Sequence, residues 1–278
     1  MELLAGHSLA WLLGLAASLL VTGVVAGLLA GMLGVGGGIV IVPVLFHLFT
    51  LLGIDPAVRM HLAVGTSLAS IIPTSITSAL AHCRRGNLDP ALIRHLLPSV
   101  LVGVLVGNLL SGQLSGKILT AVFACIALLV ALNMAFRPER ITPGHRLPGR
   151  WGTAGIGGSI GGLSTLMGIG GGTLSVPILS HFGTPMHRAV GTGAMLGTVI
   201  SIPGALGFLV NGWHALHLPP ASLGYVNLLG LALIVPATML TTGRGARLAA
   251  RTDARRLRQV FAAFLALTSV RMFIALLG

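Results

Sequence analysis

Long apolar runs dominate the chain, and short breaks of glycine, proline or charge separate them. In the first half these runs cover residues 8–33, 39–52, 57–81, 90–110 and 114–136. In the second half they cover residues 152–168, 173–183, 189–211, 221–241 and 256–277. A helix needs about 20 apolar residues to cross a bilayer, and most of these runs reach that length. The pattern predicts an all-α polytopic membrane protein whose segments cross the bilayer fully or in part.

The two halves of the chain resemble each other. The pattern G-[VI]-G-G-G-x-x-x-V-P-[VI]-L begins at Gly34 and again at Gly168, which is 134 residues later. A-V-G-T then follows in each half, and an Ile-Pro pair comes after it. Matches that recur in the same order indicate an internal duplication. We therefore predict an N-terminal repeat over 1–136, a polar cytoplasmic linker over 137–151 and a C-terminal repeat over 152–278.

Charge changes the picture in two ways. Only 8% of the residues are charged and 54% are hydrophobic, which argues against a soluble enzyme. The net charge of +12 comes mainly from arginines in three loops, 82–89, 137–151 and 243–258. Such loops are typical of the cytoplasmic side of membrane proteins, so the charge does not indicate nucleic-acid binding. We expect a multi-pass protein of the cell (inner) membrane, surrounded by the lipid bilayer.

The charged loops also predict how the two halves are oriented. Each half contains an odd number of segments, so the second half should cross the membrane in the opposite sense to the first. Loop 53–60 is then expected outside and its counterpart 183–188 inside. Two repeats of about five segments each with inverted topology are a recurring architecture of secondary transporters.

The duplicated glycine motif interrupts an apolar run within the membrane zone of both halves. Broken helices are tolerated there only where protein buries them or where they line a wet cavity. Their glycines let backbone N–H groups face inward at the positive end of a half-helix, which attracts anions. A proline in each following helix would disturb it and free a carbonyl. Close helix packing or a hinge remains the alternative. The candidate substrate-binding residues from this motif are Gly36, Gly37, Gly38, Pro43, Gly170, Gly171, Gly172 and Pro177.

Acidic residues are informative because they avoid the apolar runs. The five acids lie in termini or loops, at Glu2, Asp55, Asp89, Glu139 and Asp253. A site for Na⁺, for protons or for a cationic substrate normally needs a carboxylate within the membrane. The sequence thus favours an anionic or neutral solute, and it predicts no metal, no cofactor and no enzymatic activity.

Other polar residues are candidates for a transport role. Thr66, Ser67 and Thr192 follow the breaks and could donate hydrogen bonds to an anion, although hydrogen bonding between helices explains them equally well. Two Arg-His pairs lie near the expected mouths of the protein and could recruit an anion, gate access or carry a proton. The alternative is that they only extend toward the membrane interface. These pairs are Arg59 with His61 and His187 with Arg188.

The duplicated glycine motif, each copy followed by A-V-G-T, resembles the TauE/SafE family of sulfite and organosulfonate exporters over roughly residues 20–275. The resemblance implies export of a small sulfur oxyanion, such as sulfite or sulfoacetate, and a site at the glycines and prolines of the two motifs. The second copy has Gly193 where the first has Ser67, and it has four extra residues before its Ile-Pro pair. The two half-sites therefore cannot be strictly symmetric.

The sequence therefore predicts a secondary transporter that exports a small sulfur-containing anion by alternating access. An anion channel, or a transporter of another small anionic solute, remains an alternative. An integral-membrane enzyme or an assembly subunit would need a nucleophile–base or metal set, which the motifs do not provide. Besides the anion and the bilayer, the pattern is compatible with a homo-oligomer and not with a nucleic-acid partner.

Overall fold

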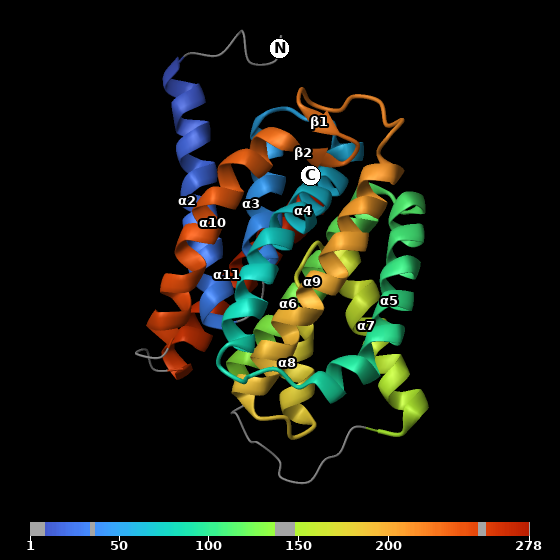
Figure 1. The fold of residues 1–278 in the computed structure, drawn as a ribbon. Coiled ribbons are helices and arrows are strands. Elements are labelled where there is room, and N and C mark those ends of the chain that lie inside the picture. Colours follow the sequence, from blue (N-terminus) through green and yellow to red (C-terminus); the bar gives the residue numbers. More distant parts are fainter. Residues whose placement is uncertain (1–8, 34–36, 137–147, 250–253, 278) are drawn as a thin grey trace.

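The computed structural model describes residues 9–33, 37–136, 148–249 and 254–277, which form a bundle of helices (Figure 1). The helices of the first half are α2 (Leu9–Leu33), α3 (Gly38–Leu51), α4 (Pro56–Cys83), α5 (Pro90–Gln113) and α6 (Gly116–Phe136). Those of the second half are α7 (Arg150–Met167), α8 (Gly172–His181), α9 (Met186–Asn211), α10 (Leu228–Ala249) and α11 (Ala254–Leu277). Most of the linker 137–151 lies outside the described residues.

Local sequence signals explain where several helices begin. Asp55 precedes α4 and accepts a hydrogen bond from Ala57 N at 2.8 Å. Asp89 precedes α5 and accepts one from Leu92 N at 3.0 Å. In both helices a proline occupies the first turn, where its missing N–H costs nothing. Two of the five acids are therefore used as helix caps.

The region between α9 and α10 corrects the sequence prediction. A helical segment was expected to begin near residue 221, but β1 (Ser222–Leu223) and β2 (Val226–Asn227) form a short antiparallel ribbon there. The α10 helix begins only at Leu228, and the Asn227 side chain caps it by accepting from Gly230 N at 2.8 Å. At its other end α10 continues to Ala249, well into the predicted loop 243–258, because arginine and alanine are good helix formers.

Within the described residues, five helices are long and apolar enough to cross a membrane: α4, α5, α6, α9 and residues 228–245 of α10. The helices that follow the two glycine motifs are much shorter. The α3 helix has 14 residues and α8 has 10, so they extend about 21 and 15 Å. Neither length spans a hydrocarbon core of about 30 Å.

Helices of the two halves pack against each other in matching pairs. The α2 helix packs on α10 just as α7 packs on α5, and the α4–α9 and α6–α11 pairs each join corresponding helices. Glycines permit this closeness, since a Cβ on Gly27 would overlap Thr241 and one on Gly103 would overlap the Gly158 carbonyl. In Figure 1 the α4 and α9 helices run side by side in opposite directions.

One end of the bundle gathers the arginine-bearing segments. The α4–α5 connection, the start of α7 and the end of α10 all lie toward the lower end in Figure 1, which we call the Arg-rich end. The α3–α4 connection lies at the opposite end, whereas the equivalent α8–α9 connection lies at the Arg-rich end.

Candidate functional site

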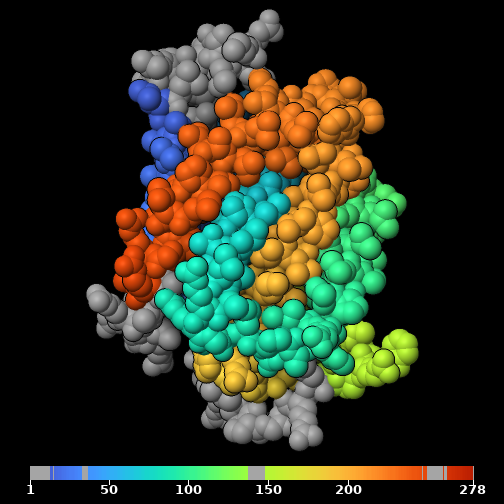
Figure 2. Space-filling view, viewed as in Figure 1, coloured from blue at the N-terminus to red at the C-terminus, as the bar shows by residue number. Residues whose placement is uncertain are grey.

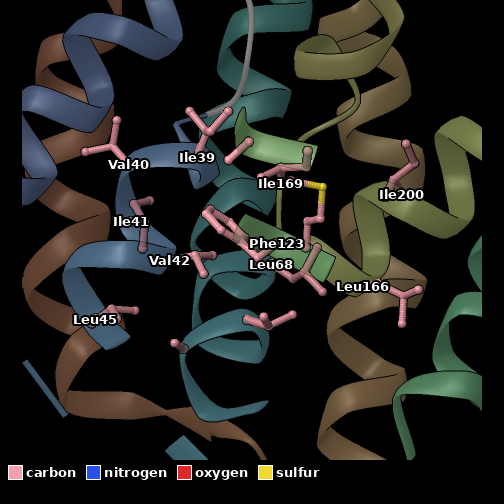
Figure 3. Packing of buried hydrophobic residues seen from close by; sticks show 14 of the residues in the cluster. Ile39, Val40, Ile41, Val42, Leu45, Leu68, Phe123, Leu166, Ile169 and Ile200 are labelled. Atoms are coloured by element: carbon pink, nitrogen blue, oxygen red, sulfur yellow. The ribbon is translucent and has the colours of Figure 1, made fainter. Parts of the chain in front are cut away.

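The two glycine-rich breaks meet in the interior of the bundle, next to α4 and α9. A Cβ on Gly38 would overlap the Gly168 carbonyl and lie 3.0 Å from Ile169 Cα. Ser67 of α4 donates a hydrogen bond to the Gly168 carbonyl at 2.7 Å. Buried apolar side chains from both halves pack around this junction, among them Ile39 and Ile169 (Figure 3). The duplicated motifs are thus brought together, although Gly36 lies outside the described residues.

The backbone turns differently in the two breaks. Gly37 has φ +79° and Gly168 has φ +65°, a left-handed conformation that favours glycine. These two residues do not occupy equivalent positions in the motif, because Gly168 opens its copy and Gly37 lies near the end of the other. Gly171 is the counterpart of Gly37 and has φ −53°. The breaks share a sequence but not a conformation.

A half-helix starts from each break, α3 at Gly38 and α8 at Gly172. The first turn of a helix leaves N–H groups without partners in the helix and carries partial positive charge. The α8 start lies tightly against α9, since a Cβ on Gly171 would be 2.7 Å from Gly197 N. A Cβ on Gly193 would be 2.8 Å from Ser175 Oγ. Glycine at 193 therefore lets α8 approach α9. Gly170 is buried in the same break.

Four hydroxyl groups around the C-terminal break are buried and have no hydrogen-bond partner. They come from α7, α8 and α9, which pack against one another, and they belong to Ser164, Thr173, Ser175 and Thr192. Buried hydroxyls are normally bonded, and leaving one unsatisfied costs about 1–3 kcal/mol. A group of unsatisfied donors beside a helix N-terminus is chemically suited to the oxygens of an anion or to water.

Sequence analysis selected only one of these four hydroxyls, Thr192. Thr173 and Ser175 occupy variable positions of the glycine motif, where the first copy has Ile39 and Ile41. Ser164 precedes the motif, at the position that Ala30 occupies in the first half. Aligning the two copies residue by residue would have revealed this difference in polarity.

Hydroxyls at the N-terminal side of the junction already have partners. Thr66 Oγ1 accepts a hydrogen bond from Asn227 N at 2.8 Å, which connects α4 to the ribbon before α10. Ser67 donates to Gly168, as described above. Each of these two hydroxyls therefore joins α4 to another part of the protein.

The motif prolines lie inside the half-helices, beyond the first turn. Pro43 is buried within α3, and Pro177 is exposed within α8. Both helices continue past their prolines. They therefore shape the half-helices and do not line the breaks themselves.

The first Arg-His pair contacts nearby backbone at the end opposite to the Arg-rich end. The Arg59 guanidinium donates to the Ile54 carbonyl, with distances of 3.1 Å from Nε and 2.7 Å from Nη2. His61 is buried, and its Nε2 lies 3.1 Å from the carbonyls of both Ser111 and Leu114. These contacts join the starts and ends of neighbouring helices.

His61 also stacks on Tyr225 of the ribbon turn, with the ring centroids 4.9 Å apart. Burial raises the pKa of the Tyr225 phenol, because desolvation disfavours the phenolate. His187 and Arg188, by contrast, are exposed at the start of α9. The two pairs thus lie at opposite ends of the bundle, and of the two histidines only His61 is buried in the interior.

No group of three His, Cys, Asp or Glu side chains that could hold a metal ion occurs within the described part of the chain. Cys83 and Cys125 are free and exposed. The chemistry of the junction therefore comes from hydroxyl and backbone groups.

Comparison with known proteins finds similarity over most of the chain. Residues 19–272 match the family model described as Sulfite exporter TauE/SafE. A probable membrane transporter protein of Haemophilus influenzae is 34% identical over 258 residues, which cover 92% of this chain and 97% of that protein. A probable membrane transporter protein of Methanocaldococcus jannaschii is 27% identical over 260 residues, which cover 92% of this chain and 94% of that protein. No solved structure matches significantly.

The similarity extends over nearly the full length of these relatives and includes both glycine-rich breaks. It agrees with the long apolar helices of the bundle. The chain belongs to the TauE/SafE family and is a multi-pass membrane transporter.

Proposed function

We propose that the protein is a secondary transporter that exports a small sulfur-containing anion, such as sulfite or an organosulfonate, by alternating access. The observation that carries this proposal is the group of unsatisfied hydroxyls at the C-terminal break, beside the N-terminus of α8. The anion binds there, between the half-helices and α9. The family description, which names sulfite export, supports the choice of substrate.

The chemistry of the junction favours an anion. Hydroxyl and backbone N–H groups can all donate to the oxygens of sulfite or of a sulfonate. Carboxylates would repel such a substrate, and the described acids Asp55 and Asp89 are used as helix caps at the ends of the bundle. The site is therefore rich in donors and free of competing negative charge in the part of the chain that the structure describes.

Alternating access follows from treating the halves as inverted repeats with re-entrant glycine-rich hairpins. This treatment is supported by the matching helix pairs and by the opposite placement of the α3–α4 and α8–α9 connections. In such proteins one repeat rocks against the other around a site near the midplane. The junction of the two breaks is the point about which this movement would expose the anion to either side.

The test is transport by the purified protein in proteoliposomes. Sulfite, sulfoacetate, thiosulfate and sulfate are compared, and empty liposomes serve as the control. We expect saturable flux of sulfite or sulfoacetate, with counterflow when unlabelled substrate is placed on the opposite side. Flux without saturation or counterflow would show an anion channel instead. If none of the four anions is transported or bound, the sulfur-anion proposal is wrong.

A further inference from the structure

One face of α4 carries small polar side chains and a histidine, spaced four residues apart. This polar row consists of Thr66, Ser70, Thr74, Ser78 and His82, and all five side chains are buried. Residues four apart lie on the same face of a helix. The row therefore runs from the junction of the breaks, where Thr66 lies, to the Arg-rich end of α4.

The α10 helix faces this row with threonines of its own. Thr74 Oγ1 and Thr238 Oγ1 are 3.2 Å apart, and Thr242 follows Thr238 at the same four-residue spacing. Both helices end at the Arg-rich end, and Figure 2 shows α4 lying between α10 and α9 on the visible face. We call this half of the α4–α10 contact the inner seam, formed by Ser70, Thr74, Ser78, His82, Thr238 and Thr242.

The inner seam is weakly cross-bonded. Ser70 donates to the Thr66 carbonyl at 2.8 Å, and Thr74 lies 3.0 Å from the Ser70 carbonyl. Thr242 donates to the Thr238 carbonyl at 2.6 Å. These hydroxyls keep their own-helix bonds if the helices separate. Among the described residues of the two helices, Thr74–Thr238 is the side-chain hydrogen bond that spans the seam.

The counterpart contact at the other end is held more firmly. In the duplication α5 and α9 correspond to α10 and α4. Asn108 Nδ2 donates to the Pro203 carbonyl at 2.9 Å, and Asn211 Nδ2 contacts the Asn108 carbonyl at 2.8 Å and Ser111 Oγ at 3.1 Å. The face of α9 that continues from Thr192 is apolar, with Leu196, Ile200, Gly204 and Phe208. Hydroxyl side chains at this four-residue spacing thus continue from the junction along α4 toward the Arg-rich end, and not along the matching face of α9.

The mouth of the inner seam is suited to an anion. The buried His82 Nδ1 has no hydrogen-bond partner, so the row ends in an unsatisfied polar atom. Arg84 and Arg85 follow directly, and α10 contributes the exposed Arg244 and Arg247 at the same end. Positive charge around an opening raises the local concentration of anions. The connection 212–227 at the opposite end has neither lysine nor arginine.

The α4 helix also contacts α9 beside the candidate site, through Ser75, which follows Thr74 of the row in the sequence. Thr198 of α9 donates to Ser75 Oγ on α4 at 3.1 Å. A Cβ on the neighbouring Gly197 would lie 3.4 Å from both Ser75 Cβ and Gly171 N. Only one glycine of α9 therefore separates α4 from the C-terminal break at this level.

We propose that the inner seam is the cytoplasmic half of the substrate path, along which a small oxyanion enters between α4 and α10 with His82 at its mouth. This inference rests on the proposed function and assigns the route to the same site. When α4 and α10 separate, one side-chain hydrogen bond between them breaks. The hydroxyls of the seam are then exposed to water and can donate hydrogen bonds to the anion. An exporter loads its substrate from this side.

The experiment measures access by a sulfonate probe. Single cysteines replace Thr74, Ser78 or, as the control in the apolar counterpart, Ile200, in a chain that also carries Cys83→Ser and Cys125→Ser. Inside-out vesicles expose the cytoplasmic side to the membrane-impermeant anion 2-sulfonatoethyl methanethiosulfonate. We expect Thr74→Cys and Ser78→Cys to react at least tenfold faster than Ile200→Cys. Sulfoacetate, which does not react chemically with the probe as sulfite would, should slow their reaction.

The outcomes separate the two proposals. If positions 74 and 78 react no faster than position 200 while these variants still transport sulfite, the inner seam is not the path and the proposed function stands. If they react quickly but no sulfur anion is transported or slows the reaction, the path is supported and the sulfur-anion function is wrong.

Isosteric variants test the path without a new thiol. Thr74→Val with Thr238→Val removes the polar groups of the seam at nearly constant volume, and sulfite efflux should slow at least fivefold. Thr77→Val is the matched control, because the Thr77 hydroxyl donates to the Pro73 carbonyl of its own helix and lies off the row. Equal efflux from the double variant and the control would overturn the inference.

Discussion

The two glycine-rich breaks have the same motif but opposite chemistry. The N-terminal break has Ala30, Ile39 and Ile41 where the C-terminal break has Ser164, Thr173 and Ser175. All six side chains are buried. The first set adds to the apolar core, whereas the hydroxyls of the second set have no partner. The two copies of the motif therefore give one break that is packed with apolar side chains and another whose buried hydroxyls have no partner.

This difference teaches that a repeated motif need not give two equal half-sites. The apolar break packs closely around the start of α3, and in the proposed function the hydroxyls of the polar break gain their partners when the anion binds. Unsatisfied buried groups lower the stability of the empty protein and are compensated when a ligand bonds them. Three predictions test this comparison.

The largest expected effect is on the packed break. Gly37→Ala places a side chain at φ +79°, and its Cβ would be 3.0 Å from the Ala26 carbonyl. We expect a loss of about 2–3 kcal/mol in stability from backbone strain and close contact together. Gly53→Ala is the matched control, because Gly53 has φ +68° but open space around it. Thermal unfolding in detergent should show a clearly larger decrease for Gly37→Ala than for Gly53→Ala.

The next prediction concerns the polar break. Thr173→Val with Ser175→Ala removes two unsatisfied hydroxyls, so the protein should become more heat-stable while sulfite transport falls about tenfold, or about 1.4 kcal/mol. Thr165→Val is the control, since the Thr165 hydroxyl already bonds the Gly161 carbonyl at 2.8 Å. A double variant that loses stability and keeps full transport would show that these hydroxyls serve the fold and not the substrate.

The smallest expected effect is on the contact between α4 and the C-terminal break. Ser67→Ala removes the hydrogen bond to the Gly168 carbonyl and should cost about 1 kcal/mol. Ser70→Ala, which removes a bond within α4, should cost less because that carbonyl keeps its helical N–H partner. Melting temperatures measured side by side decide this point, and equal decreases would mean that the Ser67 bond does not stabilise the contact between α4 and the C-terminal break.

Much of the fold could be predicted from the sequence because the signals that begin and end most helices lie in the neighbouring residues. Apolar runs bounded by glycine, proline or charge placed most of the helices within a few residues of their observed bounds. The ribbon before α10 escaped this treatment, since the pairing of Ser222 with Asn227 depends on contacts that an apolar run does not reveal. Thr66 illustrates the same limit, because its partner Asn227 N is 161 residues away.

The sequence by itself indicated the class of protein, because the length of the apolar runs decides which segments can enter a bilayer. It also showed the likeness of the two halves and which loops carry the arginines. Only the tertiary structure decided which hydroxyls are satisfied and which are not. Whether Ser67 or Ser175 has a partner depends on which backbone atoms the opposite repeat brings within reach. Hydrogen bonding is short-ranged and directional, so it is settled only once the helices have packed.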